Sequence, residues 1–204
     1  MTKIKICGLT SEADIVAVNE ILPDYIGFVF AKSRRQISEE TARRLKDHLN
    51  PRIQSVGVFV NEKIETVIRL CENNLLDLVQ LHGDETEEYI LRLKKVISQP
   101  VAKAIRVSGP EALIRADDLP CDYLLLDTYH KEQYGGSGIC FDWSSIPGLN
   151  KPYFLAGGLQ RDNVSQAISQ LSPFCVDVSS SVETDGVKDR NKIIEFVTKV
   201  RSVR

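Results

Sequence analysis

The chain has 204 residues, of which 43% are hydrophobic and 26% are charged, as is typical of a soluble globular protein. Its 26 basic and 28 acidic residues give a net charge of −2, which indicates neither nucleic acid nor an anionic membrane as a partner. Five dispersed cysteines without a CxxC pair argue against a disulfide framework and a structural zinc site. With no signal-peptide-like or long apolar stretch, these features predict a cytoplasmic protein.

Eight short apolar runs recur along the chain, and their length suits buried strands. They are rich in Val, Ile, Leu and aromatic residues, as expected for strands that are covered on both faces. They occupy residues 3–7, 25–30, 53–60, 76–81, 101–106, 121–127, 152–156 and 174–178.

Most of the stretches between these runs are predicted to be helices, because their apolar residues recur at helical spacing. The pattern covers residues 38–49, 62–73, 85–97 and 189–200, and Ser38 is the expected N-cap of the first of these helices. Residues 109–118 and 141–149 carry a weaker pattern, and the second of these is expected to hold no more than a turn of helix.

Alternating strands and helices indicate parallel βαβ units, and eight units favour closure into a barrel. The alternative is an open doubly wound sheet, but Gly8-Leu9-Thr10 after the first strand is not the glycine fingerprint of that fold. The fold prediction is therefore α/β, a single (β/α)8 TIM barrel with a parallel eight-stranded core. Residues 1–204 are expected to form one catalytic domain, shorter than the usual barrel of about 250 residues.

In such a barrel the active site forms at the C-terminal ends of the strands. Cys7 and Asp127 both stand at predicted strand ends. Cys7 is either a small buried apolar residue or, as a thiolate, a base whose pKa nearby positive charge could lower. Asp127 either caps the following loop or, with a pKa raised by burial, acts as a general acid.

Three clusters of small residues lie late in the chain, at residues 135–138, 156–158 and 179–181. Each could simply form a tight turn. Because loops after the last two strands of a barrel commonly hold phosphate, their convergence favours a phosphate site. Arg34 and Arg35 follow the second strand, where one of them could bind a carboxylate through two hydrogen bonds.

The three histidines lack the spacing of metal ligands, and no metal is predicted.

Taken in order, the strand-end motifs resemble those of the phosphoribosylanthranilate isomerase family. The resemblance runs from residue 3 to about residue 189, and the ordered set is far more specific than any one string. The strings are Lys5-Ile6-Cys7-Gly8-Leu9-Thr10, residues 27–30 (GFVF), Lys32-Ser33-Arg34-Arg35, residues 56–61 (VGVFVN), Gln80-Leu81-His82-Gly83, Leu126-Asp127, Gly135-Gly136-Ser137-Gly138 with residues 141–143 (FDW), residues 155–159 (LAGGL), and Asp177-Val178-Ser179-Ser180 with Val182-Glu183.

The resemblance implies an Amadori rearrangement of N-(5-phosphoribosyl)anthranilate to 1-(2-carboxyphenylamino)-1-deoxyribulose 5-phosphate in tryptophan biosynthesis. It implies Asp127 as the general acid that opens the ribose ring and Cys7 as the base that removes the C2′ proton. It further implies Arg35 as the group that binds the anthranilate carboxylate. No cofactor or metal is implied, the only partner is the small-molecule substrate, and the chain is expected to be a monomer or homodimer.

The remaining residues implied by the resemblance fall into two groups. The pocket is expected to be lined by Gln80, His82 and Asp177. The phosphate is expected to bind the backbone at Gly136, Ser137, Gly138, Gly157, Gly158, Ser180 and Ser181.

Two positions depart from the family pattern. The family has a proline where this chain has Arg34, so either Arg34 or Arg35 could meet the carboxylate. The family has glycine where this chain has Ser181, so the serine must tolerate the backbone angles or shift the loop.

Two other interpretations remain open, of which the first is another phosphate-binding barrel enzyme. Histidine-pathway sugar-phosphate isomerases use paired aspartates at the first and fifth strands, where this chain has Cys7 and Arg106. Indole-glycerol-phosphate synthases need more lysine and glutamate at the barrel mouth than this chain has there. The other alternative is a barrel that binds a phosphosugar without converting it, which the pairing of Cys7 with Asp127 disfavours.

Overall fold

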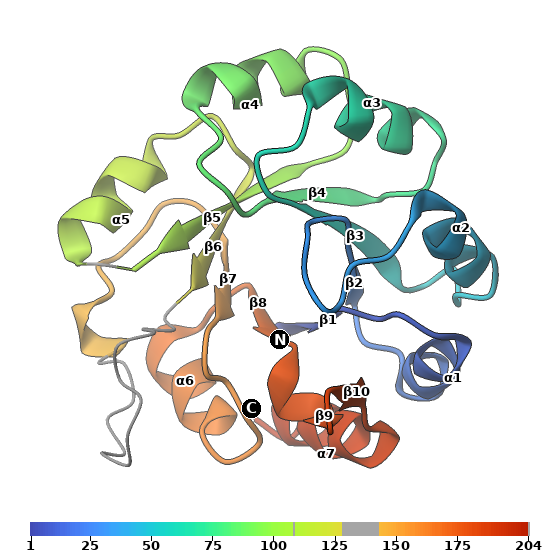
Figure 1. The fold of residues 1–204 in the computed structure, drawn as a ribbon. Helices are drawn as coiled ribbons and strands as arrows, with labels where there is room; N and C mark the ends of the chain where they lie inside the picture. The colour runs from blue at the N-terminus through green and yellow to red at the C-terminus, as the bar shows by residue number, and fades with distance from the viewer. Residues whose placement is uncertain (108, 128–142, 204) are drawn as a thin grey trace.

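The computed structural model describes residues 1–107, 109–127 and 143–203. Eight parallel strands close into a barrel in the order of the sequence, with β8 pairing back onto β1 (Figure 1). Helices surround this barrel on the outside. The predicted (β/α)8 barrel is confirmed.

Each predicted apolar run contains one barrel strand. The strands are β1 (Lys3–Cys7), β2 (Tyr25–Val29), β3 (Gln54–Phe59), β4 (Leu78–Leu81), β5 (Val101–Arg106), β6 (Tyr123–Asp127), β7 (Tyr153–Ala156) and β8 (Cys175–Val178). The strands are shorter than several of the runs, because some apolar residues lie in the turns that precede them.

The α-helices lie between successive strands and after β8, except between β6 and β7, where the described residues form only a 3₁₀ turn. They are α1 (Glu12–Ile21), α2 (Glu39–Asp47), α3 (Ile64–Glu72), α4 (Glu87–Lys94), α5 (Pro110–Asp117), α6 (Val164–Leu171) and α7 (Arg190–Arg201). Ser38 caps α2 as predicted, with its Oγ accepting a hydrogen bond from the Thr41 N–H at 3.1 Å.

The two stretches with a weak helical pattern differ from each other. Residues 109–118 form the two-turn helix α5, which begins at Pro110, a residue that suits a first helical turn. In the part of 141–149 that the structure describes, only the 3₁₀ turn η1 (Trp143–Ser145) forms, as expected.

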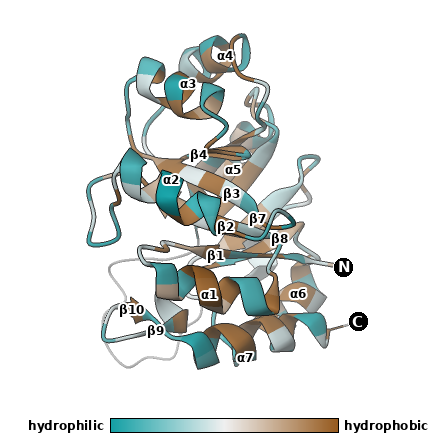
Figure 2. Cartoon of the chain, turned by 90° about the vertical axis from the view of Figure 1, so that its right-hand side faces the viewer, coloured by the Kyte–Doolittle hydropathy of each residue, from teal (hydrophilic) through white to brown (hydrophobic). Residues whose placement is uncertain are grey.

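The strands bury both faces. Outward-facing side chains such as Ile4, Ile6 and Phe28 pack in one large core between the barrel and its helices. Figure 2 accordingly shows hydrophobic colour on the central strands, while the helices carry both colours. None of the helices in the described residues is long and apolar enough to cross a membrane.

The N-terminal end of the barrel interior is filled by an aromatic plug, formed by Tyr25, Tyr123, Phe154 and Phe174. Their ring centroids lie 4.9–5.6 Å apart, and the Lys3 ammonium lies over two of the rings. Because this end is closed, a ligand can enter the barrel only from the C-terminal ends of the strands.

A small hairpin stands between β8 and α7, beside the barrel mouth (Figure 1). It pairs β9 (Glu183–Thr184) with β10 (Val187–Lys188) in antiparallel register. Asp185 and Gly186 form its turn with φ of 51° and 83°, the left-handed backbone that a two-residue hairpin turn favours. The hairpin places Glu183 opposite Lys188.

Candidate active site

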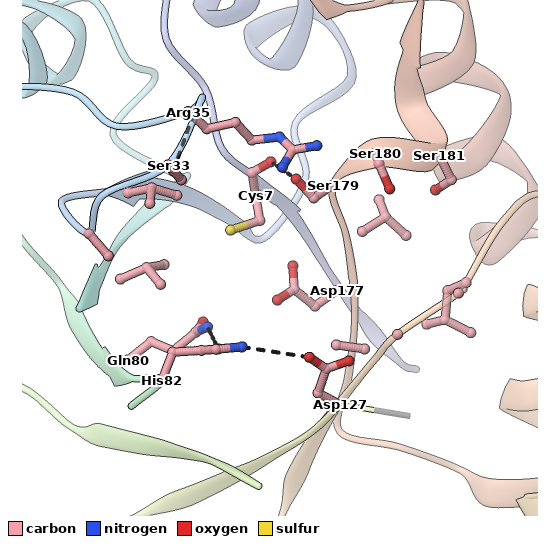
Figure 3. A pocket seen from close by; sticks show the side chains of 18 of the residues that line it. Cys7, Ser33, Arg35, Gln80, His82, Asp127, Asp177, Ser179, Ser180 and Ser181 are labelled. Carbon is pink, nitrogen blue, oxygen red and sulfur yellow. Dashed lines mark hydrogen bonds and ion pairs between the residues drawn. The ribbon is translucent and has the colours of Figure 1, made fainter. Parts of the chain in front are cut away.

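A cavity of about 700 Å³ opens at the C-terminal ends of the barrel strands (Figure 3). It brings together every predicted site residue that the structure describes. These residues are Cys7, Arg35, Gln80, His82, Asp127, Gly157, Gly158, Asp177, Ser180 and Ser181. The predicted phosphate residues Gly136, Ser137 and Gly138 lie outside the described residues.

Cys7 is the last residue of β1, and its thiol faces this cavity. Its neighbour on β2 is Gly27, where a Cβ would lie only 2.6 Å from the Cys7 sulfur. A side chain at position 27 would therefore displace the thiol. Burial raises the pKa of Cys7 above its usual value, and although the Lys5 ammonium acts in the opposite direction, burial prevails.

Asp127 ends β6 on another side of the cavity. Its carboxylate is 28% exposed, and its Oδ2 lies 3.6 Å from the His82 Nε2. In the view of Figure 3, Asp177 lies between Cys7 and Asp127. A ligand in the cavity can therefore meet a thiol and a carboxyl group from different directions.

A buried polar cluster joins three strands beneath these two residues. The Lys5 Nζ donates to Gln80 Oε1 at 2.6 Å and to Asp177 Oδ2 at 2.7 Å. Gln80 Nε2 in turn lies 2.9 Å from His82 Nδ1. Lys5 is fully buried. Burial is the largest single influence and would lower the pKa of Lys5, but the Asp177 carboxylate together with Cys7 and Cys175 outweighs it and the pKa is raised, so the ammonium is charged.

The two arginines after β2 take different positions. Arg35 lines the cavity and is 21% exposed, whereas Arg34 is 58% exposed and is not among the lining residues. Arg35 reaches the cavity over Gly8, where a Cβ would lie 2.4 Å from the Arg35 Cδ and where φ is +83°. Of the two, Arg35 is therefore the one placed to meet a ligand.

Glu183 holds the Arg35 guanidinium in place. Its two oxygens accept from Arg35 Nε at 2.6 Å and Nη2 at 2.8 Å, and Lys188 Nζ donates to the same carboxylate at 2.5 Å. Burial would raise the pKa of Glu183, but the bonds from Arg35 and Lys188 lower it to about 2. The bonds to Glu183 use Nε and one of the two Nη2 hydrogens of Arg35, which leaves Nη1 and the second Nη2 hydrogen for a ligand as far as the described residues go.

The described part of the predicted phosphate site comprises the loops after β7 and β8. Gly157 and Gly158 both adopt left-handed backbone, with φ of 83° and 70°. Ser181 lies in the 3₁₀ turn η2 (Ser180–Val182) without a positive φ, so its Cβ causes no backbone strain. The Ser181 hydroxyl is buried and has no hydrogen-bond partner among the described residues.

Among the polar residues without a predicted role, Lys5, Glu183 and Lys188 form hydrogen bonds with side chains that line the cavity. The sequence offers one clue, since Lys5 stands at the centre of an otherwise apolar strand and must face the barrel interior. The other two are supplied by the hairpin. Among the described residues, no group of three or more His, Cys, Asp or Glu side chains could hold a metal ion.

Comparison with known proteins shows which family the chain is similar to. The family model for N-(5′-phosphoribosyl)anthranilate isomerase matches residues 4–199. The enzyme of that name from Endomicrobium trichonymphae is 53% identical over 203 residues, covering 100% of both chains.

Solved structures of phosphoribosyl anthranilate isomerases are similar to this chain as well. Phosphoribosyl anthranilate isomerase from Thermotoga maritima is 40% identical, with a TM-score of 0.86 over 98% of this chain and 99% of that one. A phosphoribosyl anthranilate isomerase in complex with reduced 1-(o-carboxyphenylamino)-1-deoxyribulose 5-phosphate is 36% identical. Its TM-score is 0.83, again over 98% of this chain and 99% of that one.

Proposed function

The chain belongs to the N-(5′-phosphoribosyl)anthranilate isomerase family, and from this premise we propose how its cavity performs that isomerisation. The substrate is N-(5-phosphoribosyl)anthranilate, the product is 1-(2-carboxyphenylamino)-1-deoxyribulose 5-phosphate, and the reaction is a step of tryptophan biosynthesis. Residues 1–204 act as one catalytic domain. The observation that carries the proposal is that one cavity contains Cys7, Asp127, Arg35 and the small-residue loops after β7 and β8.

Binding fixes the two ends of the substrate. The Arg35 guanidinium, oriented by Glu183, binds the anthranilate carboxylate. The backbone N–H groups near Gly157, Gly158, Ser180 and Ser181 bind the phosphate, together with residues 136–138. The buried Ser181 hydroxyl is a further donor to a phosphate oxygen. These contacts hold the ribose between the acid and the base.

The first step opens the ribose ring. Asp127, protonated, transfers its proton to the ring oxygen while the bond from C1 to that oxygen breaks. The nitrogen lone pair of the anthranilate forms a C=N bond, so a cationic Schiff base results and the ring oxygen leaves as a hydroxyl. Asp127 is then a carboxylate, and His82 beside it, 3.6 Å away, can stabilise that charge.

The second step removes the C2 proton. The Cys7 thiolate takes this proton, the electrons of the C–H bond form a C1–C2 double bond, and the Schiff-base nitrogen becomes neutral. The resulting enolamine gains a proton at C1 and loses the one on its C2 oxygen, which gives the ketone. No oxidant or reductant is needed, because the two carbons exchange oxidation levels.

The order of the steps explains how a thiol with a raised pKa can act as a base. Burial raises the pKa of Cys7, which disfavours the thiolate. The Schiff base formed in the first step places a positive charge beside C2, and a nearby positive charge lowers a thiol pKa. Acid catalysis at Asp127 therefore prepares base catalysis at Cys7.

The test is a fluorescence assay of the purified chain on freshly generated substrate, with EDTA present. Cys7→Ala and Asp127→Asn are each expected to lower kcat by about 10²–10⁴-fold while the free energy of unfolding is little changed. Cys71→Ala, which removes a buried thiol on α3 far from the cavity, is the matched control and should keep its turnover.

Two outcomes would contradict the proposal. The first is a parent chain that binds the phosphorylated product without converting the substrate, which would indicate a binding protein. The second is turnover that EDTA abolishes, which would show that a metal takes part.

A further inference from the structure

We propose that Lys5 and Gln80 are positioning residues that hold His82 as the neutral tautomer with its proton on Nε2, the nitrogen that faces Asp127. The consequence for catalysis rests on the proposed function, in which Asp127 is the general acid. The tautomer itself follows from the polarity of one chain of contacts. That chain runs from Lys5 through Gln80 and His82 to Asp127 (Figure 3).

The chemistry of lysine determines which atom donates and which accepts in each of these contacts. An ammonium group carries only donors, so the Gln80 atom 2.6 Å from Lys5 Nζ must be the carbonyl oxygen. The amide NH2 of Gln80 must then point the other way, toward His82 Nδ1 at 2.9 Å. An NH2 group is a donor, so Nδ1 must accept with its lone pair. A neutral imidazole with an accepting Nδ1 carries its hydrogen on Nε2.

Burial prevents the donor and acceptor directions of these contacts from reversing. Lys5 is 0% exposed and Gln80 is 3% exposed, so water is a poor substitute partner for either. The ammonium is also held by Asp177 Oδ2 at 2.7 Å, which keeps it charged and in place. If the Gln80 amide rotated by half a turn, its NH2 would face the Lys5 ammonium, and two buried donors would oppose each other.

The state of His82 matters because of its distance to Asp127. A histidine cation 3.6 Å from Asp127 Oδ2 would favour the carboxylate and deprive the reaction of its acid. A neutral ring with a donor on Nε2 has a different effect. It leaves Asp127 able to hold a proton at the start, and it can donate to the carboxylate once that proton has moved to the ribose. This distance is long for a hydrogen bond, and catalytic contacts commonly tighten when substrate binds.

The experiment that tests the tautomer is the ¹⁵N spectrum of the imidazole rings in the full chain, with the His82 signals assigned by their loss in His82→Gln. The parent is expected to show a neutral ring protonated on Nε2 at pH 7.5. Protonation on Nδ1 alone, or on both nitrogens, would overturn the proposal.

Gln80→Glu reverses the polarity of the central contact at nearly constant shape. A carboxylate accepts from Lys5 and from Nδ1 alike, so His82 then lies between two carboxylates, with Asp177 also near. Its ring should become doubly protonated at pH 7.5. The kcat should fall by roughly 10- to 100-fold, part of what a general acid contributes, and the basic limb of the pH profile should move to lower pH. Gln54→Glu, at the exposed start of β3, is the matched control and should change neither readout.

Gln80→Met is a second variant that places no charge in the barrel. It removes the donor to Nδ1, and the ring should then populate both neutral tautomers. An unchanged spectrum in both Gln80 variants would overturn the proposal. A parent chain with the predicted tautomer but no turnover would instead overturn the proposed function and leave the tautomer assignment supported.

Discussion

The lower and upper layers of the barrel interior differ in chemistry although the same strands build both. The lower layer is the aromatic plug, whose Phe154 is fully buried and touches the rings of Tyr25 and Tyr123. Further along the strands the inward side chains become polar: Asp127 lies four residues after Tyr123 on β6, and Asp177 lies two residues after the buried Cys175 on β8. Side chains two apart on a strand share a face. The barrel interior can therefore change from apolar packing residues to polar residues that face the cavity while the strands stay regular.

The two layers also show what makes buried charge tolerable. The plug contains no charged side chain, and its stability comes from area removed from water. The upper layer is the cavity end of the barrel, where Lys5 Nζ and Asp177 Oδ2 are buried 2.7 Å apart. In the loops above it, Arg35 is paired with Glu183, so each of these charges has a partner. The comparison predicts that changes in the lower layer alter stability, whereas changes in the upper layer alter turnover or substrate binding.

The largest effect is expected from Phe154→Ala in the plug. Removing this ring leaves a cavity among the other three aromatic side chains, and the free energy of unfolding should fall by about 3–5 kcal/mol. The kcat of the folded fraction should stay within a few-fold of the parent. Urea unfolding measures the first quantity and the fluorescence assay the second, with the exposed Val16→Ala as the control. A stable variant that has lost turnover would contradict a purely structural role for the plug.

Gly27→Ala tests the upper layer, because it moves the thiol of Cys7. The added Cβ would lie 2.6 Å from the Cys7 sulfur and 3.1 Å from the Cys7 Cα, so the thiol must move. A displaced base should lower kcat by about 10²-fold, and the crowding should cost about 1–3 kcal/mol of stability. Gly148→Ala, where nothing lies within 4 Å of the added Cβ, should match the parent in kcat. Parent-like turnover in Gly27→Ala would show that the position of Cys7 does not matter.

Arg35→Lys tests the binding part of the upper layer. Lysine cannot bind both Glu183 and a substrate carboxylate in the planar geometry of a guanidinium, so KM should rise about 10-fold with kcat nearly constant. Arg34→Lys is the matched control: Arg34 also donates to Glu183, at 2.7 Å, but it is exposed and a lysine can keep that ion pair, so KM should change less than about 2-fold. If the two variants exchanged these results, Arg34 would be the carboxylate ligand.

The smallest effect is expected in the acid stability of Glu183→Gln. The folded-state pKa of Glu183 is about 2, below its ordinary value of 4.5. Its carboxylate therefore contributes stability that is fully present above pH 4.5 and is lost as the pH falls toward 2. Over that range the free energy of unfolding should decline more steeply in the parent than in the variant. Urea titrations at several pH values measure this, and parallel declines would contradict it.

The sequence predicted the barrel and most of the cavity for a simple reason. Strand ends of a closed parallel barrel converge, so residues such as Cys7, His82 and Asp127 could be grouped without knowing any contact. The weak pattern at 109–118 still gave α5, because packing against the barrel and a favourable Pro110 outweigh modest amphipathicity.

Other features depend on pairings that no local pattern shows. Lys5 meets Asp177, 172 positions away, and Glu183 meets Arg35, 148 positions away. The raised pKa of Cys7 likewise depends on how deeply the thiol is buried relative to its distance from Lys5, which sequence alone does not give. The sequence thus identified which candidate residues share the cavity, but the direction of their pKa shifts required the structure.

The most direct test of the central account is the kinetic isotope effect on kcat/KM for substrate deuterated at C2, compared between Cys7→Ser and Asp127→Asn. If Cys7 removes the C2 proton, weakening the base makes that step limiting, and the isotope effect should lie well above one. If Asp127 opens the ring, removing the acid makes ring opening limiting, and the effect should fall close to one. The reverse pattern, or equal effects in the two variants, would contradict the assignment of acid and base.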